Sequence, residues 1–84
     1  MIEKNVQIAL GGVLMTREAA KVAHELKRFA ARVLLRRGEM TVNGKSLMGI
    51  VSLGICDGQR VTVITDGEDE EAAAEAFVRA MQRI

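Results

Sequence analysis

The sequence has 84 residues, enough for one compact domain, and its 49% hydrophobic and 27% charged residues are typical of a globular protein rather than a disordered one. Twelve Lys and Arg against eleven Asp and Glu leave a net charge of +1, which argues against binding of nucleic acid through a basic excess. The single Cys argues against a disulfide framework, and the single His argues against a two-histidine zinc site. Two Phe are the only aromatic residues, which argues against a stacking surface for single-stranded bases.

No apolar run in the sequence approaches the roughly 20 residues that a membrane span requires, and the first residues do not form a basic leader. No linker, repeat or low-complexity tract divides the chain. We therefore expect a single cytoplasmic domain over residues 1–84, without a membrane segment, a bound metal or a cofactor.

The first predicted elements are a strand and a helix. Val6, Ile8 and Leu10 alternate with polar or small residues, as in a strand with one buried face, and the glycine pair that follows ends it. Thr16 is a good N-cap residue and predicts that a helix begins there. The expected buried stripe of this helix has helical spacing and consists of Ala19, Val22, Ala23, Leu26 and Ala30.

The middle of the chain predicts a hairpin followed by a short helix. Residues 32–37 and 40–43 are the expected strands of the hairpin, because the turn between them is short and contains glycine. Ser46 is a second N-cap candidate, and the apolar segment 47–53 after it is typical of a short helix. Gly54 is expected to end that helix.

A last strand and a last helix complete the pattern. Val61 and Val63 alternate with neighbours of different polarity and predict the fourth strand. Acidic residues 68–71 are expected in the first turn of the last helix, with Arg79 and Arg83 in its last turn, which complements the helix dipole at both ends. The expected buried residues of this helix are Ala73, Phe77, Ala80 and Ile84.

The order of these elements is β-α-β-β-α-β-α. Helices that all lie on the same face of a four-stranded sheet give a two-layer α+β architecture. The hairpin makes the sheet mostly antiparallel. We therefore predict a four-stranded, mostly antiparallel sheet with three helices on one face.

The sequence Gly44-Lys45-Ser46, between a predicted strand and a predicted helix, is suited to bind a phosphate group. The sequence argues against a phosphate-binding loop, because that motif needs a glycine five residues before Gly44 and the position holds Glu39. Two interpretations of Ser46 are then open. Its hydroxyl either caps the helix and does nothing else, which local pattern favours, or the same position also carries a phosphate next to the positive end of the helix.

The short helix after Ser46 is apolar nearly all round, and a helix on one face of a sheet cannot bury every side. We expect some of Leu47, Met48 and Val51 to face solvent beside Ser46. Exposed apolar patches usually mark surfaces that bind a partner, although neighbouring loops could also cover these residues.

Basic residues are expected on an exposed face of the first long helix, which carries Arg17, Lys21, Lys27 and Arg28. This face is either simply solvated or receives an acidic partner or a phosphate, and the sequence does not choose between them. His24 is the only histidine and has no acid or nucleophile beside it in the pattern, and the role of Cys56 is also left open.

Two segments, GVLMTREAA at residues 12–20 and NGKSLMGIVSLG at residues 43–54, give the chain a specific resemblance. Together with the element order, they make it similar to the HPr family, the small phosphocarriers of the bacterial sugar phosphotransferase system. The resemblance covers essentially the whole chain and implies the family's open-faced β-sandwich.

The first segment departs from the family's motif, Gly-Leu-His-(Ala/Thr)-Arg-Pro-Ala-Ala. The histidine that carries the phosphoryl group falls on Met15 and the proline falls on Glu18, whereas Arg17 is kept. A thioether is not phosphorylated by this chemistry. The Glu18 carboxylate would also repel an incoming phosphoryl group by about 1 kcal/mol or more. The resemblance therefore implies a protein without enzymatic activity that does not relay phosphate through histidine.

The second segment implies regulation through Ser46. In Gram-positive members the matching serine is phosphorylated by an ATP-dependent HPr kinase/phosphorylase, and the phosphorylated protein is a corepressor for a LacI-type catabolite control regulator. The Crh-like subgroup lacks the histidine but keeps the serine. Carried over to this chain, Ser46 is the regulatory phosphorylation site, and the expected partner contacts are Arg17, Leu47, Met48 and Val51.

Two alternatives to this regulatory role stay open at the level of sequence. The first is a module that binds its partner constitutively through the same apolar patch, whether or not Ser46 is phosphorylated. The second is a residual phosphocarrier that uses His24.

Overall fold

The computed structural model describes residues 1–83. Seven elements follow one another in the predicted order: β1 (Ile2–Gln7), α1 (Thr16–Leu26), β2 (Arg32–Arg37), β3 (Met40–Asn43), α2 (Leu47–Leu53), β4 (Arg60–Asp66) and α3 (Glu70–Met81). Residue Ile84, which the sequence places on the buried stripe of the last helix, lies outside the described residues.

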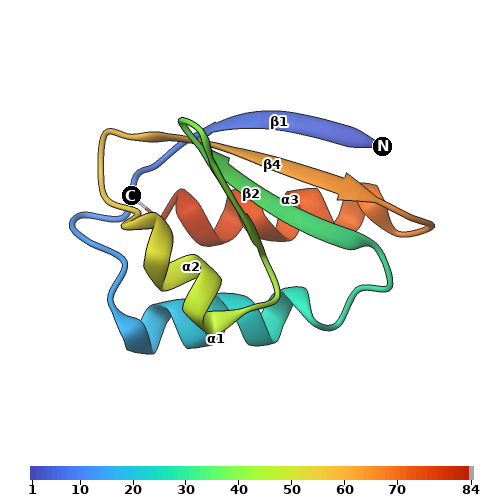
Figure 1. Cartoon of the computed structure of the whole chain (residues 1–84), viewed down its shortest axis with the longest axis horizontal. Coiled ribbons are helices and arrows are strands. Elements are labelled where there is room, and N and C mark those ends of the chain that lie inside the picture. Colours follow the sequence, from blue (N-terminus) through green and yellow to red (C-terminus); the bar gives the residue numbers. More distant parts are fainter. Residues whose placement is uncertain (84) are drawn as a thin grey trace.

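The four strands form one sheet in the order β1-β4-β2-β3, and all three neighbouring pairs are antiparallel. The three helices lie together on one face of this sheet, as Figure 1 shows. Both layers of the predicted α+β architecture are therefore confirmed. The hairpin is also confirmed, because β2 pairs with β3 from Arg37 opposite Met40 to Leu34 opposite Asn43.

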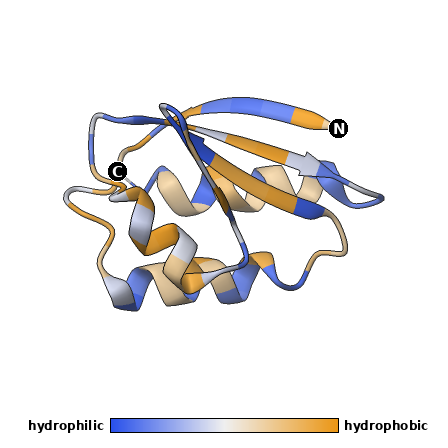
Figure 2. Cartoon of the chain, viewed as in Figure 1, coloured by the Kyte–Doolittle hydropathy of each residue, from blue (hydrophilic) through white to orange (hydrophobic). Residues whose placement is uncertain are grey.

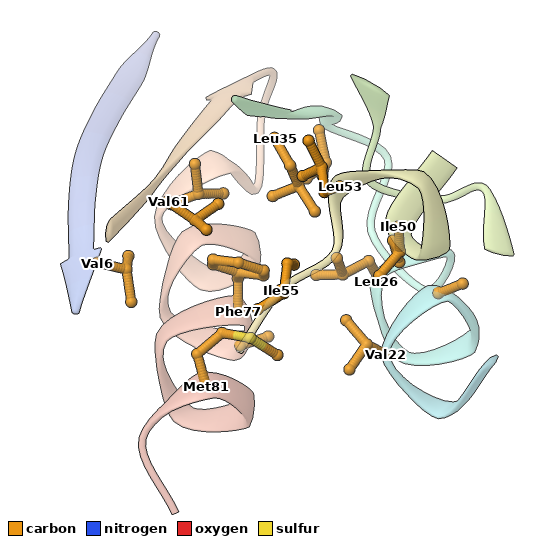
Figure 3. Packing of buried hydrophobic residues seen from close by; sticks show 14 of the residues in the cluster. Val6, Val22, Leu26, Leu35, Ile50, Leu53, Ile55, Val61, Phe77 and Met81 are labelled. Atoms are coloured by element: carbon orange, nitrogen blue, oxygen red, sulfur yellow. The ribbon is translucent and has the colours of Figure 1, made fainter. Parts of the chain in front are cut away.

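The core lies between the sheet and the helices. Phe77 of α3 is fully buried, and Figure 3 shows it in the same cluster as Leu26 of α1 and Ile50 of α2. The strands contribute alternate residues to the core, and Figure 2 shows hydrophobic and hydrophilic residues interleaved along the strands and the helices. The largest fully buried side chains are Phe77, Ile8, Leu26, Leu35, Ile50, Leu53, Ile55, Met81, Val22, Val33, Val61 and Val63.

Helix α1 differs from its prediction at both ends. Its N-cap residue is Met15, not Thr16, which is the first helical residue. At the other end the helix stops at Leu26, so that Ala30 is exposed rather than part of the buried stripe. The reason is tertiary: the Asp69 carboxylate accepts hydrogen bonds from the backbone N–H groups of Ala30 (2.9 Å) and Ala31 (2.8 Å), which turns the chain toward β2.

The first strand ends earlier than the sequence pattern predicts. Strand β1 ends at Gln7, and although Ile8 is still buried, Leu10 is only half-buried. The Asp57 carboxylate explains this end, because it accepts hydrogen bonds from the N–H groups of Leu10 and Gly11 and bends the chain away from the sheet.

Helix α3 begins at Glu70, so that Glu68 and Asp69 precede it and Arg83 follows its end. Ala80 of the expected stripe is half-buried. Ala73 and Phe77 are fully buried as predicted, and Met81, one turn after Phe77, is fully buried where Ala80 was expected.

Candidate functional site

Ser46 caps helix α2. Its backbone is extended, and its Oγ accepts a hydrogen bond from the backbone N–H of Gly49 at 3.1 Å. The predicted N-cap and the predicted end of the helix at Gly54 are both confirmed, and Gly54 adopts the left-handed conformation with φ of 61°. Ser46 is half-buried, so the fold does not seal this residue from solvent. Within residues 1–83, the Ser46 hydroxyl is the one side-chain group that accepts a hydrogen bond from an N–H group at this helix end.

The segment before Ser46 is held tightly against the sheet. The backbone N–H of Lys45 donates to the side-chain oxygen of Asn43 at 2.9 Å, which is a local turn typical of asparagine. Gly44 lies so close to β2 that a Cβ atom there would come within 2.6 Å of Val33 Cγ1. The position of the Ser46 hydroxyl is therefore fixed by the end of β3 and by the packing of Gly44.

The apolar patch beside Ser46 is only partly covered. Met48 is 70% exposed and Val51 is 37% exposed, whereas Leu47 is half-buried and packs against the core. The prediction that some of these side chains face solvent is confirmed for Met48 and Val51. Their role as partner contacts stays a prediction. We refer to Leu47, Met48 and Val51 as the α2 patch.

Met15, the residue in the family's phosphohistidine position, lies at the start of α1 with its side chain 64% exposed. Its carbonyl accepts the first helical hydrogen bond, from the N–H of Ala19 at 2.8 Å, and no side chain caps the helix. Glu18 is half-buried in the first turn of α1. Both residues line one surface hollow, whose other lining residues are Leu10, Gly11, Gly12, Val13, Leu14 and Arg83.

The structure places Met15 and Ser46 at opposite ends of the α1–α2 pair. The N–H of Leu14 donates to the carbonyl of Ile55 at 2.8 Å, which joins the start of α1 to the chain just after α2. At the other end, Lys45 Nζ donates to the carbonyl of Phe29 at 2.6 Å, which joins the start of α2 to the chain just after α1. The two helices lie side by side in Figure 1, and α2 is about 10 Å long at 1.5 Å per residue.

The basic face of α1 is exposed, as the sequence predicts. Arg17, Lys21, His24, Lys27 and Arg28 all lie in contact with solvent. Within the described residues, Arg28 pairs with Glu25 at 3.3 Å and its guanidinium lies 5.3 Å from the centre of the Phe29 ring. No ion pair of Arg17 or His24 occurs in the described part of the chain, so the structure leaves these groups available to a partner but assigns them none.

Three charged residues that support this surface have no signal in the local sequence. Lys45 binds the Phe29 carbonyl, Asp57 binds the chain before α1, and Asp69 binds the chain after it. The N–H groups of Ala30 and Ala31 stabilise the carboxylate form and hold the pKa of Asp69 below its usual value. These partners are between 16 and 47 residues away in sequence, so only the tertiary fold brings them together.

Among residues 1–83, no group of three or more His, Cys, Asp or Glu side chains is arranged to hold a metal ion. No helix in that range combines the length and the apolar character needed to cross a membrane.

Comparison with known proteins decides the family. A family model described as "PTS HPr component phosphorylation site" matches residues 2–83 of the chain. The chain belongs to the HPr family. Its fold is that of the solved phosphocarrier protein HPr from Bacillus anthracis, with 41% identity, a TM-score of 0.91 and 96% of each chain covered. The resemblance inferred from the two sequence segments is confirmed.

Among curated HPr-family relatives, the chain is similar to two proteins named HPr-like protein Crh. The one from Halalkalibacterium halodurans is 37% identical over 83 residues, which is 99% of both chains. The one from Bacillus subtilis is 38% identical over 82 residues, which is 98% of this chain and 96% of the relative. This HPr-family chain is therefore related over its full length to both Crh-like and phosphocarrier members, and it is connected to the phosphotransferase system through its family.

Proposed function

We propose that this HPr-family chain is a cytoplasmic regulatory protein that is phosphorylated on Ser46 and does not carry phosphate on a histidine. The observation that carries the proposal is the contrast between the two ends of the α1–α2 pair. Met15 presents an exposed thioether where the family motif has an imidazole, while the Ser46 end keeps a half-buried hydroxyl with an exposed Met48 next to it.

The proposed partners follow from the family. An HPr kinase/phosphorylase would modify Ser46, and a LacI-type catabolite control regulator would bind the phosphorylated form. The α2 patch supports this role, because apolar side chains that stay exposed next to a modification site are suited to contact a partner. Arg17, which is exposed at the other end of α1, would add a cationic contact.

The experiment that tests this proposal is phosphorylation by an HPr kinase with ATP, measured by mass spectrometry. We expect one added phosphate on the wild-type chain. Ser46→Asn is the matched control, because asparagine is as good an N-cap as serine but has no hydroxyl to phosphorylate. A wild-type chain that gains no phosphate, or a Ser46→Asn variant that still gains one, would contradict the proposal.

A second candidate function is constitutive binding through the α2 patch, and the 70% exposure of Met48 favours it because the patch is accessible without any modification. A pull-down separates the two functions. Binding that is unaffected by Ser46→Asn and Ser46→Asp but lost in Met48→Glu would support the constitutive module. Binding that requires phosphorylated Ser46 would support the regulatory protein.

A residual phosphocarrier that uses His24 is the third possibility. Incubation with phosphoenolpyruvate and enzyme I tests it directly, because a phosphohistidine is labile in acid. We expect no acid-labile phosphate on His24, which is exposed in the second half of α1, away from the hollow at Met15.

A further inference from the structure

The chain places most of its methionines on the surface, although methionine commonly fills gaps in hydrophobic cores. It has five methionines, of which Met81 is fully buried. The other four are exposed: Met1 by 77%, Met48 by 70%, Met15 by 64% and Met40 by 45%. Only Met48 belongs to the surface next to Ser46, since Met15 lies at the far end of the α1–α2 pair and Met40 lies on β3.

An exposed thioether is a nucleophile toward peroxides. A lone pair of the sulfur attacks one oxygen of hydrogen peroxide, an S–O bond forms, and the O–O bond breaks. After proton transfer the second oxygen leaves as water, so the thioether is oxidised to a sulfoxide and the peroxide is reduced. Methionine sulfoxide reductases reverse the reaction, and the change can therefore act as a switch.

Oxidation of Met48 would change the surface where the proposed kinase must bind. Met48 lies in the first turn of α2, two residues after Ser46, and Ser46 Oγ is fixed there by the N–H of Gly49. A sulfoxide replaces the apolar end of the side chain by a strongly polar S–O group. Covering that group with an apolar partner surface leaves it without a hydrogen bond, which is unfavourable. The fold itself should not change, because 70% of the Met48 side chain is already in solvent.

We propose that Met48 is a peroxide-sensitive modification site and that its sulfoxide slows phosphorylation of Ser46. The proposal rests on the proposed function, because it concerns the same surface and the same kinase. Under this proposal the rate of Ser46 phosphorylation depends on two factors: the activity of the kinase and the oxidation state of Met48.

The experiment compares four proteins: the wild type, Met48→Leu, Met15→Leu and Met40→Leu. Leucine keeps the apolar volume and removes the sulfur, and the last two variants are controls with similarly exposed methionines elsewhere. Each protein is treated with hydrogen peroxide, the peroxide is removed with catalase, and peptide mass spectrometry locates the added oxygen atoms. An HPr kinase and ATP are then added, and the phosphorylation rate is compared with that of the untreated protein.

We expect oxidation at Met48 but not at buried Met81, and a rate that falls by about tenfold in the wild type, Met15→Leu and Met40→Leu. The rate of Met48→Leu should stay unchanged, and methionine sulfoxide reductase should restore the other three. A chain that carries the Met48 sulfoxide and is still phosphorylated at the untreated rate would overturn the proposal. So would an equal loss of rate in Met48→Leu. An untreated wild type that is never phosphorylated would instead overturn the proposed function, and this proposal with it.

Discussion

The Ser46 hydroxyl caps α2 and is also the proposed phosphorylation site, so replacing Ser46 with alanine removes the cap and the proposed phosphate acceptor together. The hydroxyl accepts a hydrogen bond from the N–H of Gly49 at 3.1 Å. Because α2 has only seven residues, loss of this cap affects a large part of the helix. Removing a serine N-cap costs typically about 1 kcal/mol, in a range of roughly 0.5 to 2 kcal/mol. For a domain of this size, about 1 kcal/mol lowers the melting temperature by roughly 4 to 8 °C.

Thermal unfolding followed by circular dichroism measures this loss in the wild type, Ser46→Ala and Ser46→Asn. We expect Ser46→Ala to melt several degrees lower than the wild type. Ser46→Asn should melt close to the wild type, because its side-chain oxygen can accept the same N–H group. The comparison also matters for function, since loss of phosphorylation in Ser46→Ala alone would not distinguish a missing hydroxyl from a loosened helix.

Two results would refute this reasoning. If Ser46→Ala melts at the wild-type temperature, the hydrogen bond to Gly49 contributes nothing to stability. If Ser46→Asn melts as low as Ser46→Ala, the loss comes from the packing of the serine side chain and not from capping.

Three further predictions concern the hollow at Met15, the chain after α1 and the segment before Ser46. Met15→His alone should accept little acid-labile phosphate from phosphoenolpyruvate and enzyme I. Adding Glu18→Gln should raise the amount of phosphate about fivefold, because one nearby negative charge is removed. Equal labelling of the two variants would contradict a role for that charge. Because hydrogen bonds lower the pKa of Asp69 in the folded chain from its usual 3.8, its stabilising effect is present above that value and is lost as the pH falls through the lower folded pKa. Urea titrations at a series of pH values should therefore show an acid-dependent loss of stability that is smaller in Asp69→Asn. Gly44→Ala should destabilise the fold by about 1 to 3 kcal/mol, because its Cβ would overlap Val33, whereas Gly12→Ala, where the structure leaves open space, should unfold at nearly the same urea concentration as the wild type.

Local sequence patterns predicted most of the fold, because α1 and β4 have a clear period and because serine and glycine mark the two ends of the apolar α2. The alternation at Val61 and Val63 and the glycine at the end of α2 both predicted what the structure contains. The Ser46 cap was also predictable, because serine followed by an apolar helical segment is a local signal. The start of α1 was not, since Thr16 is a better capping residue than Met15 and yet lies one position inside the helix.

The supports of the candidate site could not be predicted from local patterns. Asp57 and Asp69 look like ordinary turn and helix-start residues, but each binds two backbone N–H groups of a segment at least 38 residues away. Lys45 has no assigned role in the sequence pattern, but its ammonium group binds the Phe29 carbonyl in the loop between α1 and β2. Such contacts depend on how the layers are stacked, which no short window of sequence contains.

The helices α1 and α2 lie side by side with the start of each next to the end of the other, so the Met15 position and Ser46 are held in place separately. The Met15 end is held through Leu14 and Ile55, and the Ser46 end through Lys45 and Phe29, so neither anchor is shared. An HPr-type chain can thus lose its group-transfer imidazole without loosening the helix that presents its serine. A partner that contacts only the Ser46 end would be unaffected by the change at Met15, whereas a partner that also contacts Arg17 would span both ends.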